Sequence, residues 1–263
     1  TPPYEMLRSL VGSEMCIRDS SRTVPLFVLP MGIFPLTQEP LRVFEPRYKQ
    51  MLDDCVLEES PFGYISTVNP PEGIGGWALP SEYGVLCVAD NLEEQGSNLL
   101  FTASGETRFR VMDILPASLP ARDFGEIFPS VDELVEEYIE ESPDGKLYLR
   151  AEIEELPPLK GIVHSDRWNK LVRRWSEHIV AIDSLVRASG MGLEDVLPIM
   201  EGEFLPYTES GLWSACQSIL DGYDDRQQAL SSEEASQVID VLENALEEKK
   251  AQMDAIRFMM ESE

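Results

Sequence analysis

Paired cysteines, long apolar runs and a secretory leader are all missing from this sequence of 263 residues. Cys16, Cys55, Cys87 and Cys216 show no CxxC spacing, so the sequence predicts neither a disulfide framework nor a zinc site. We expect these cysteines to be buried, reduced thiols. No window is long and apolar enough to cross a bilayer, and no basic start is followed by an apolar run. We therefore expect a cytoplasmic protein without a membrane partner.

Basic residues are also scarce, because 21 Lys and Arg stand against 48 Asp and Glu and give a net charge of −27. A surface this negative repels phosphate backbones and gains nothing from the release of their counterions. The composition therefore predicts that nucleic acid is not a partner of the molecule as a whole.

Conventional catalytic groups are few. His164 and His178 are the two histidines, and they have no metal-ligand spacing. His178 lies on an apolar helical face and is expected to be a core or rim residue, and His164 is expected at the surface. No GxxxxGK[ST] loop is present, since Gly145-Lys146 is followed by Leu147, and no GxSxG motif occurs. We predict no catalytic residue, no cofactor and no metal.

Short apolar runs broken by Pro and Gly extend from Val24 to about Leu115, a rhythm typical of a small β-barrel or sandwich. Strands are predicted at 24–29, 41–44, 62–68, 84–90, 98–103 and 107–115. One helix interrupts them, because Tyr48, Met51, Leu52 and Cys55 recur at helical spacing after Pro46.

Residues 116–145 form an acidic segment with nine Asp or Glu and one Arg. Ser130 and Glu133 match a capping box that would begin a short helix. Its predicted apolar stripe consists of Val131, Leu134, Val135, Tyr138 and Ile139. This stripe either packs on the surface of its own domain or serves as a protein-binding or dimerising helix.

After Pro157-Pro158 the apolar period changes from 2 to 3.6, which predicts a second, helical unit. A helix over 166–189 is expected to end at Gly190, and shorter helices are expected at 193–200 and 209–220. The predicted apolar face of the helix over 166–189 comprises Trp168, Leu171, Trp175, His178, Ile182 and Leu185. Ser231 and Glu234 suggest a second capping box for a final helix. That helix carries Val238, Leu242, Leu246, Met253, Ile256 and Met260 on one face. This face either packs on Trp168, Trp175 and Trp213 or forms a dimer seam.

Ordered motifs from about residue 24 to 246 identify a family. They are Val24–Pro30, Phe44-Glu45-Pro46-Arg47-Tyr48, Phe62–Ile65, Tyr83–Val88, Thr107–Val111, Tyr148–Ile153 and Asp225–Leu230. In order and residue type they resemble the N-terminal, substrate-binding domain of Lon proteases. The resemblance implies an α+β fold, a PUA-like β-barrel followed by a helical subdomain. We assign residues 21–160 to the barrel domain, with 116–145 as an acidic helical insertion, and 161–263 to the helical subdomain.

Residues 9–20 resemble the translation of a sequencing adaptor. We therefore predict that residues 1–20 are not native to the protein and have no ordered packing.

The resemblance implies a bacterial, non-enzymatic module that binds unfolded or degradation-targeted polypeptides. Such a stand-alone member could act as an adaptor for a separate protease or ATPase. The alternative is RNA binding, the other use of PUA-like folds, with Arg167, Lys170, Arg173 and Arg174 as a local basic turn. A hydrolase is the third reading, and no constellation of residues supports it.

Two groups of residues are candidates for defined roles. Phe44, Glu45, Pro46, Arg47 and Tyr48, with Arg108 and Phe109, are predicted to be structural, and Glu45 and Arg47 are expected to pair locally. In the segment 69–82, glycines surround Ile74, Trp77 and Leu79, which are predicted to anchor bound peptide. The competing interpretation is that Trp77 packs back onto the barrel.

Overall fold

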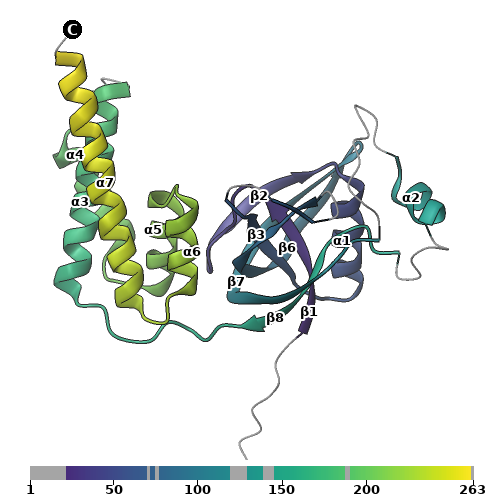
Figure 1. Cartoon of the computed structure of the whole chain (residues 1–263). Coiled ribbons are helices and arrows are strands. Elements are labelled where there is room, and N and C mark those ends of the chain that lie inside the picture. Colours follow the sequence, from purple (N-terminus) through teal and green to yellow (C-terminus); the bar gives the residue numbers. More distant parts are fainter. Residues whose placement is uncertain are drawn as a thin grey trace, which may run out of the picture.

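The computed structural model describes residues 22–69, 72–74, 77–118, 129–138, 145–186 and 190–261 (Figure 1). The predictions made for residues 1–20, for Gly75 and Gly76, and for Ile139 lie outside the described residues. Strands β1 to β3 and β6 to β8, in purple to teal, form a barrel, and green to yellow helices α3 to α7 stand beside it. The architecture is the predicted α+β class.

The described strands form a six-stranded sheet in the order β2-β7-β6-β3-β1-β8, and pairing of β7 with β8 closes it. Their bounds are β1 Arg22–Leu29, β2 Gln38–Val43, β3 Phe62–Thr67, β6 Pro80–Gln95, β7 Asn98–Leu115 and β8 Arg150–Glu155. β1 runs parallel to β3, and the other pairings are antiparallel. β4 Gly73–Ile74 and β5 Trp77–Ala78 make a separate small hairpin.

The two strands predicted at 98–103 and 107–115 are wrong as separate elements, because β7 runs through both. Gly105 is the reason. Its N–H donates to the Thr37 carbonyl at 2.9 Å, and its own carbonyl accepts from Leu36 N–H at 2.9 Å. The absence of a side chain lets the loop before β2 approach the strand directly, so the glycine marks a close backbone contact and not a turn.

Helix α1 (Pro46–Leu57) lies against the barrel wall and completes its hydrogen bonding. β8 pairs only with residues Arg22–Pro25 of β1, so the backbone of Val28 has no strand on that side. The buried Tyr48 hydroxyl takes the place of a strand: it donates to the Val28 carbonyl at 2.7 Å and accepts from Val28 N–H at 3.2 Å. The structural role predicted for Tyr48 thus has a specific form, the closure of a gap in the barrel.

Titration of Tyr48 is expected to reduce stability at high pH. Burial raises its pKa to about 12, whereas an unfolded tyrosine titrates near 10. The folded state holds the proton more tightly, so its stabilisation is complete below pH ~10 and is lost as the pH rises to ~12, by up to about 1.4 kcal/mol per pH unit. Urea unfolding of wild type and Tyr48→Phe between pH ~9 and ~11 measures this slope. An equal slope in the two proteins would contradict the assignment.

Residues 116–118, 129–138 and 145 of the acidic segment are described. Ser130 N–H donates to Glu133 Oε2 at 2.8 Å and Glu133 N–H donates to Ser130 Oγ at 3.2 Å, so this predicted capping box is confirmed. The helix that follows, α2 (Val131–Tyr138), contacts α1, and Leu134 is buried. After the segment, Gln50 of α1 bonds both Gly145 O and Leu147 N at 2.7 Å, which anchors the returning chain.

The helical subdomain consists of α3 Ser165–Val186, α4 Leu193–Phe204, α5 Glu209–Ile219, α6 Tyr223–Ser231 and α7 Ala235–Glu261. α3 and α7 lie side by side and run in the same direction, away from the barrel (Figure 1). Contacts at residues 167 with 240, 174 with 247 and 184 with 257 keep a constant register along the pair.

Barrel and helices share one continuous apolar cluster. Phe27 and Phe62 of the barrel belong to it, as do Trp168 and Trp213 of the helices. At the boundary Phe34 stacks on Trp213, with ring centroids 5.8 Å apart and planes inclined by 17°. The predicted division between residues 160 and 161 stays a prediction, because the buried cluster is continuous across it.

One prediction about the final helices is wrong. Ser231 does not cap α7; it is the last residue of α6, and its hydroxyl donates to Gln228 O. The Gln237 side chain instead accepts from Glu234 N–H at 3.1 Å. On the predicted apolar faces of α3 and α7, Ile182, Ile256 and Met260 are exposed, because both helices extend beyond those that bury their earlier turns. The choice between core packing and a dimer seam for the α7 face stays open at these residues. None of the helices in the described part of the chain has both the length and the apolarity of a membrane span.

Candidate functional site

The β4–β5 hairpin is held against the barrel by Arg47. The Arg47 guanidinium carbon lies 4.2 Å from the centre of the Trp77 ring and 4.1 Å from the centre of the Tyr48 ring. Arg47 Nε also donates to Glu45 Oε2 at 2.8 Å, the local pair that the sequence predicted. Stacking of a cation between two aromatic faces fixes the orientation of both rings.

Trp77 is half-buried and also packs on the cluster around Leu26 and Phe109. Leu79 is half-buried, and its N–H donates to Glu72 O at 2.8 Å. Ile74 pairs with Trp77 across the hairpin. The three residues predicted to anchor peptide therefore lie together on one small hairpin. Trp77 of this hairpin packs on the barrel, as expected by the interpretation that competes with a peptide anchor.

Arg108 and Phe109 are both in the interior. Phe109 is fully buried, and a Cβ at Gly84 would lie only 2.6 Å from its ring, so this glycine makes room for it. Arg108 is buried beneath the helices and donates to three carbonyl oxygens, those of Leu230 at 2.8 Å, Ser232 at 2.5 Å and Pro157 at 2.7 Å. Burial lowers the pKa of Arg108.

A second buried arginine, Arg226 of α6, makes the reciprocal contact and was not singled out from the sequence. It donates to Gly32 O in the barrel at 2.7 Å and to Leu220 O at 2.8 Å, and its guanidinium carbon lies 4.5 Å from the Phe34 ring centre. Next to it, Gln227 accepts from Tyr83 N–H and donates to Tyr83 O, both at 3.0 Å. The motif Asp225–Leu230 contains both residues, but only the fold shows that they join barrel and helices.

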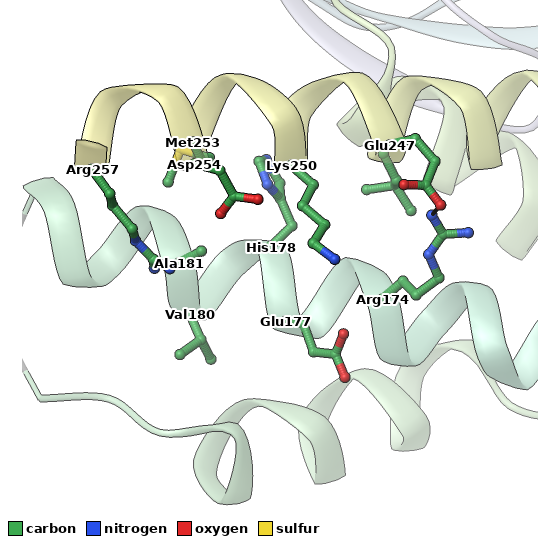
Figure 2. Close-up of a pocket in the computed structure, with 11 residues that line it drawn as sticks. Arg174, Glu177, His178, Val180, Ala181, Glu247, Lys250, Met253, Asp254 and Arg257 are labelled. Carbon is green, nitrogen blue, oxygen red and sulfur yellow. Dashed lines mark hydrogen bonds and ion pairs between the residues drawn. The ribbon is translucent and has the colours of Figure 1, made fainter. Parts of the chain in front are cut away.

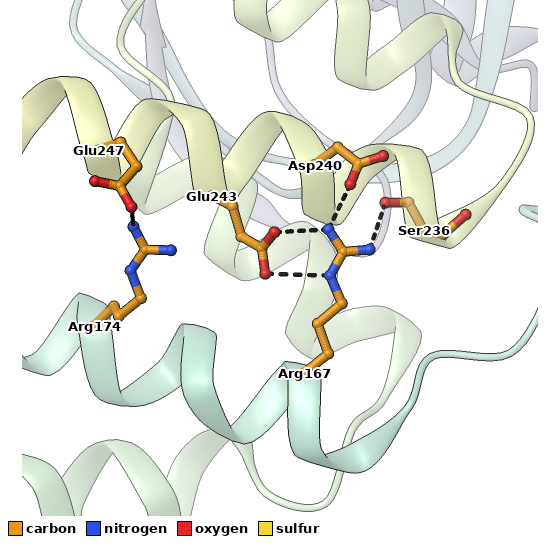
Figure 3. A network of polar contacts seen from close by, with 6 residues as sticks. All are labelled: Arg167, Arg174, Ser236, Asp240, Glu243 and Glu247. Carbon is orange, nitrogen blue, oxygen red and sulfur yellow. Dashed lines mark hydrogen bonds and ion pairs between the residues drawn. The ribbon is translucent and has the colours of Figure 1, made fainter.

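The basic turn of α3 is largely neutralised by carboxylates, as Figure 3 shows. Arg167 bonds Glu243 at 2.7 Å and Asp240 at 2.5 Å, which raises its pKa. Arg174 pairs with Glu247 of α7, and Arg173 pairs with Glu177 one turn further along α3. Three of the four predicted cations are therefore engaged with acids and do not form a basic stripe for a phosphate backbone.

A cavity of about 280 Å³ follows this network between α3 and α7 (Figure 2). His178 lies in it, and burial, followed by the positive charge of Lys249, lowers the pKa of this imidazole. Lys250, Asp254 and Arg257 extend toward it from α7. The lining contains no hydroxyl or thiol, so His178 has no serine-, threonine- or cysteine-type nucleophile there to activate.

The described thiols are unsuited to nucleophilic chemistry. Cys55, Cys87 and Cys216 are free and buried. Burial raises the pKa of Cys55 to about 11 and also raises those of Cys87 and Cys216. A thiol whose pKa is raised remains protonated at neutral pH and is a poor nucleophile. Within the described ranges, no cluster of three or more His, Cys, Asp or Glu could hold a metal ion.

The comparisons with known proteins agree with this α+β barrel and its C-terminal helices. Residues 23–247 match the model of the ATP-dependent protease La (LON) substrate-binding domain, and the chain belongs to that family. A search among curated proteins found no match.

Two solved structures are similar to this chain. The Lon N-terminal domain protein from Xanthomonas campestris is 19% identical, with 84% of this chain and 97% of that chain covered and a TM-score of 0.46. The N-terminal domain of the Mycobacterium avium complex Lon protease is 13% identical, with 86% and 98% covered and a TM-score of 0.50. At this identity the second structure bears on the fold alone.

Proposed function

We propose that this chain binds polypeptide without catalysing a reaction and acts as an adaptor that presents bound chains to a separate protease or ATPase. Its membership of a substrate-binding family carries the proposal. The lack of a hydroxyl or thiol in the lining beside His178 and the buried, protonated thiols support a non-catalytic role. Free thiols at all three described cysteines also fit a reducing compartment, so we propose a cytoplasmic location.

We further propose that the β4–β5 hairpin contacts the polypeptide through Ile74, Trp77 and Leu79. Trp77 is only partly buried, and the guanidinium of Arg47 stacks on its ring. A large side chain held in place loses little conformational entropy on binding, which raises affinity. The hairpin would therefore act as a rigid anchor and not as a mobile loop.

Trp77→Ala is expected to weaken the binding of an unfolded polypeptide by about tenfold or more, because truncation of a central aromatic anchor costs about 2 kcal/mol. Fluorescence anisotropy with a labelled, carboxymethylated unfolded protein measures the affinity. Leu57→Ala is the control, since Leu57 is exposed at the end of α1 and its loss should leave binding unchanged. Equal affinity of wild type and Trp77→Ala would remove the hairpin from the site.

RNA is tested in the same assay. The pairing of Arg167, Arg173 and Arg174 with carboxylates predicts no saturable binding of a labelled RNA at physiological salt. Salt-sensitive RNA binding together with no polypeptide binding would overturn the proposed function.

A further inference from the structure

The apolar face of α7 continues into its last turns, where no other helix covers it in the described structure. Val238, Leu242 and Leu246 are buried on this face, and Ile256 and Met260 continue it at helical spacing but are exposed. The adjacent end of α3 adds exposed apolar residues. We call the resulting surface the α3–α7 tip and define it by five side chains that are 41% to 76% exposed: Ile182, Val186, Ile256, Met259 and Met260.

The tip lies at the end of the helical subdomain that is remote from the barrel (Figure 1). α3 and α7 run in parallel away from the barrel, and the C-terminal end of α7 is far from every strand in Figure 1. A partner that binds at this end would extend the molecule without approaching the barrel.

The helix ends that form the tip carry both signs of charge in a strongly acidic protein. Residues 174–186 and 247–261 contain 6 acidic and 4 basic residues. Physiological salt screens the repulsion between charges that are more than ~8 Å apart. Two copies that meet end to end keep most of their acidic residues many times further apart than this distance. Any side-on approach would bring the acidic bodies together.

The exposed area is sufficient for a weak specific contact. With roughly 150–200 Å² for a fully exposed large side chain, the five residues present on the order of 500 Å². That is near the upper end of the apolar patches found on monomers. Two such tips would bury about 1,000 Å², which is the lower bound for a specific protein interface.

We propose that the α3–α7 tip binds the same tip of a second copy, so that two parallel helix pairs form one four-helix contact with twofold symmetry. The contact continues a face that is already core packing in the first half of α7. Its flanks carry both signs, with Asp254 and Arg257 on the same turn, as a self-complementary interface requires. The small area predicts a dimer that dissociates in the micromolar range.

Sedimentation equilibrium of the full chain at about 1 to 100 µM tests the proposal. Wild type should form a reversible dimer that tightens when salt is raised from about 50 to about 300 mM, because salt screens the repulsion between two acidic chains. The double variant Met259→Glu with Met260→Glu should weaken dimerisation by about 30-fold or more, since it would place carboxylates in an apolar contact.

Met112→Glu is the matched control, because Met112 on β7 is 56% exposed, against 60% and 62% for Met259 and Met260. It should dimerise like wild type, and circular dichroism should show that all variants are folded. A wild-type chain that is monomeric at the highest concentration and at both salts would overturn the proposal, as would an equal effect of Met112→Glu. A monomer whose tip variant loses polypeptide binding would assign the tip to polypeptide instead. The Trp77→Ala assay judges the proposed function separately.

Discussion

Replacement of Arg108 by methionine is expected to lower the free energy of unfolding by about 3–5 kcal/mol. The guanidinium is buried and donates to the carbonyl oxygens of Leu230, Ser232 and Pro157. Methionine fills a similar length but donates nothing, so three carbonyls lose charge-assisted hydrogen bonds. Methionine also removes the desolvation cost of a buried cation, but this gain offsets only part of the loss. Urea denaturation measured by tryptophan fluorescence gives the difference.

Arg110→Met is the control on the same strand. Arg110 pairs with Glu82 at 2.8 Å, but both side chains are about half exposed, and such pairs contribute less than about 1 kcal/mol. The two substitutions are chemically identical and two residues apart, so they differ only in what covers the side chain. A loss at Arg108 as small as that at Arg110 would show that the arginine does not hold the helices on the barrel.

Replacement of Gly105 by alanine is expected to cost about 2–4 kcal/mol. An added Cβ would lie 2.6 Å from the Phe34 carbonyl oxygen and 3.3 Å from Val85 Cγ1. The nearest atom belongs to the backbone of the loop that bonds Gly105 through Leu36 and Thr37, so it cannot rotate away as a side-chain end could. The loop must separate from β7, or the strand must bend.

Gly202→Ala should have the opposite sign. Gly202 lies inside α4, and a Cβ there would meet nothing within 4 Å. Alanine should stabilise the helix by up to about 1 kcal/mol, because glycine is the poorer helix former. Thermal unfolding of the two variants beside wild type is sufficient, and a Gly105→Ala protein as stable as wild type would contradict the close contact.

Two buried arginines join the barrel and the helices. Arg108 extends from β7 to the helical subdomain, and Arg226 extends from α6 to Gly32 in the barrel. Each guanidinium satisfies carbonyl oxygens at a boundary where strand and helix hydrogen bonding ends. We infer that variants at either position unfold barrel and helices together.

The sequence was sufficient for elements whose pattern is local. The period of 2 before residue 115 and the period of 3.6 after residue 160 predicted strands and helices in the right order, and Ser130 with Glu133 predicted a cap that the structure contains. Such patterns depend on neighbours within one or two turns, so a sequence displays them directly. Ser231 with Glu234 has the same spacing and failed, because α6 extends through Ser231.

The candidate site was predictable only in part. Glycines and Trp77 indicated a distinctive hairpin, but its contact with Arg47 joins residues 30 positions apart that no periodicity relates. Likewise, the sequence suggested that the basic turn on α3 could bind RNA. In the fold, Glu243 and Glu247 of α7 pair with Arg167 and Arg174 of that turn. Charge pairing between distant elements depends on the packing of both helices, which composition does not contain.

The sequence by itself determined the family, the order of strands and helices and the acidity of the chain, because these follow from local pattern and composition. Only the tertiary structure decided which polar groups meet and which apolar faces are covered. In the fold, Tyr48 bonds the backbone of Val28, and Arg108 and Arg226 are buried between barrel and helices. The helices packed against α7 do not reach as far as Ile256, which is exposed. The physical reason is that burial depends on the lengths of neighbouring elements, and α7 is longer than the helices packed against it.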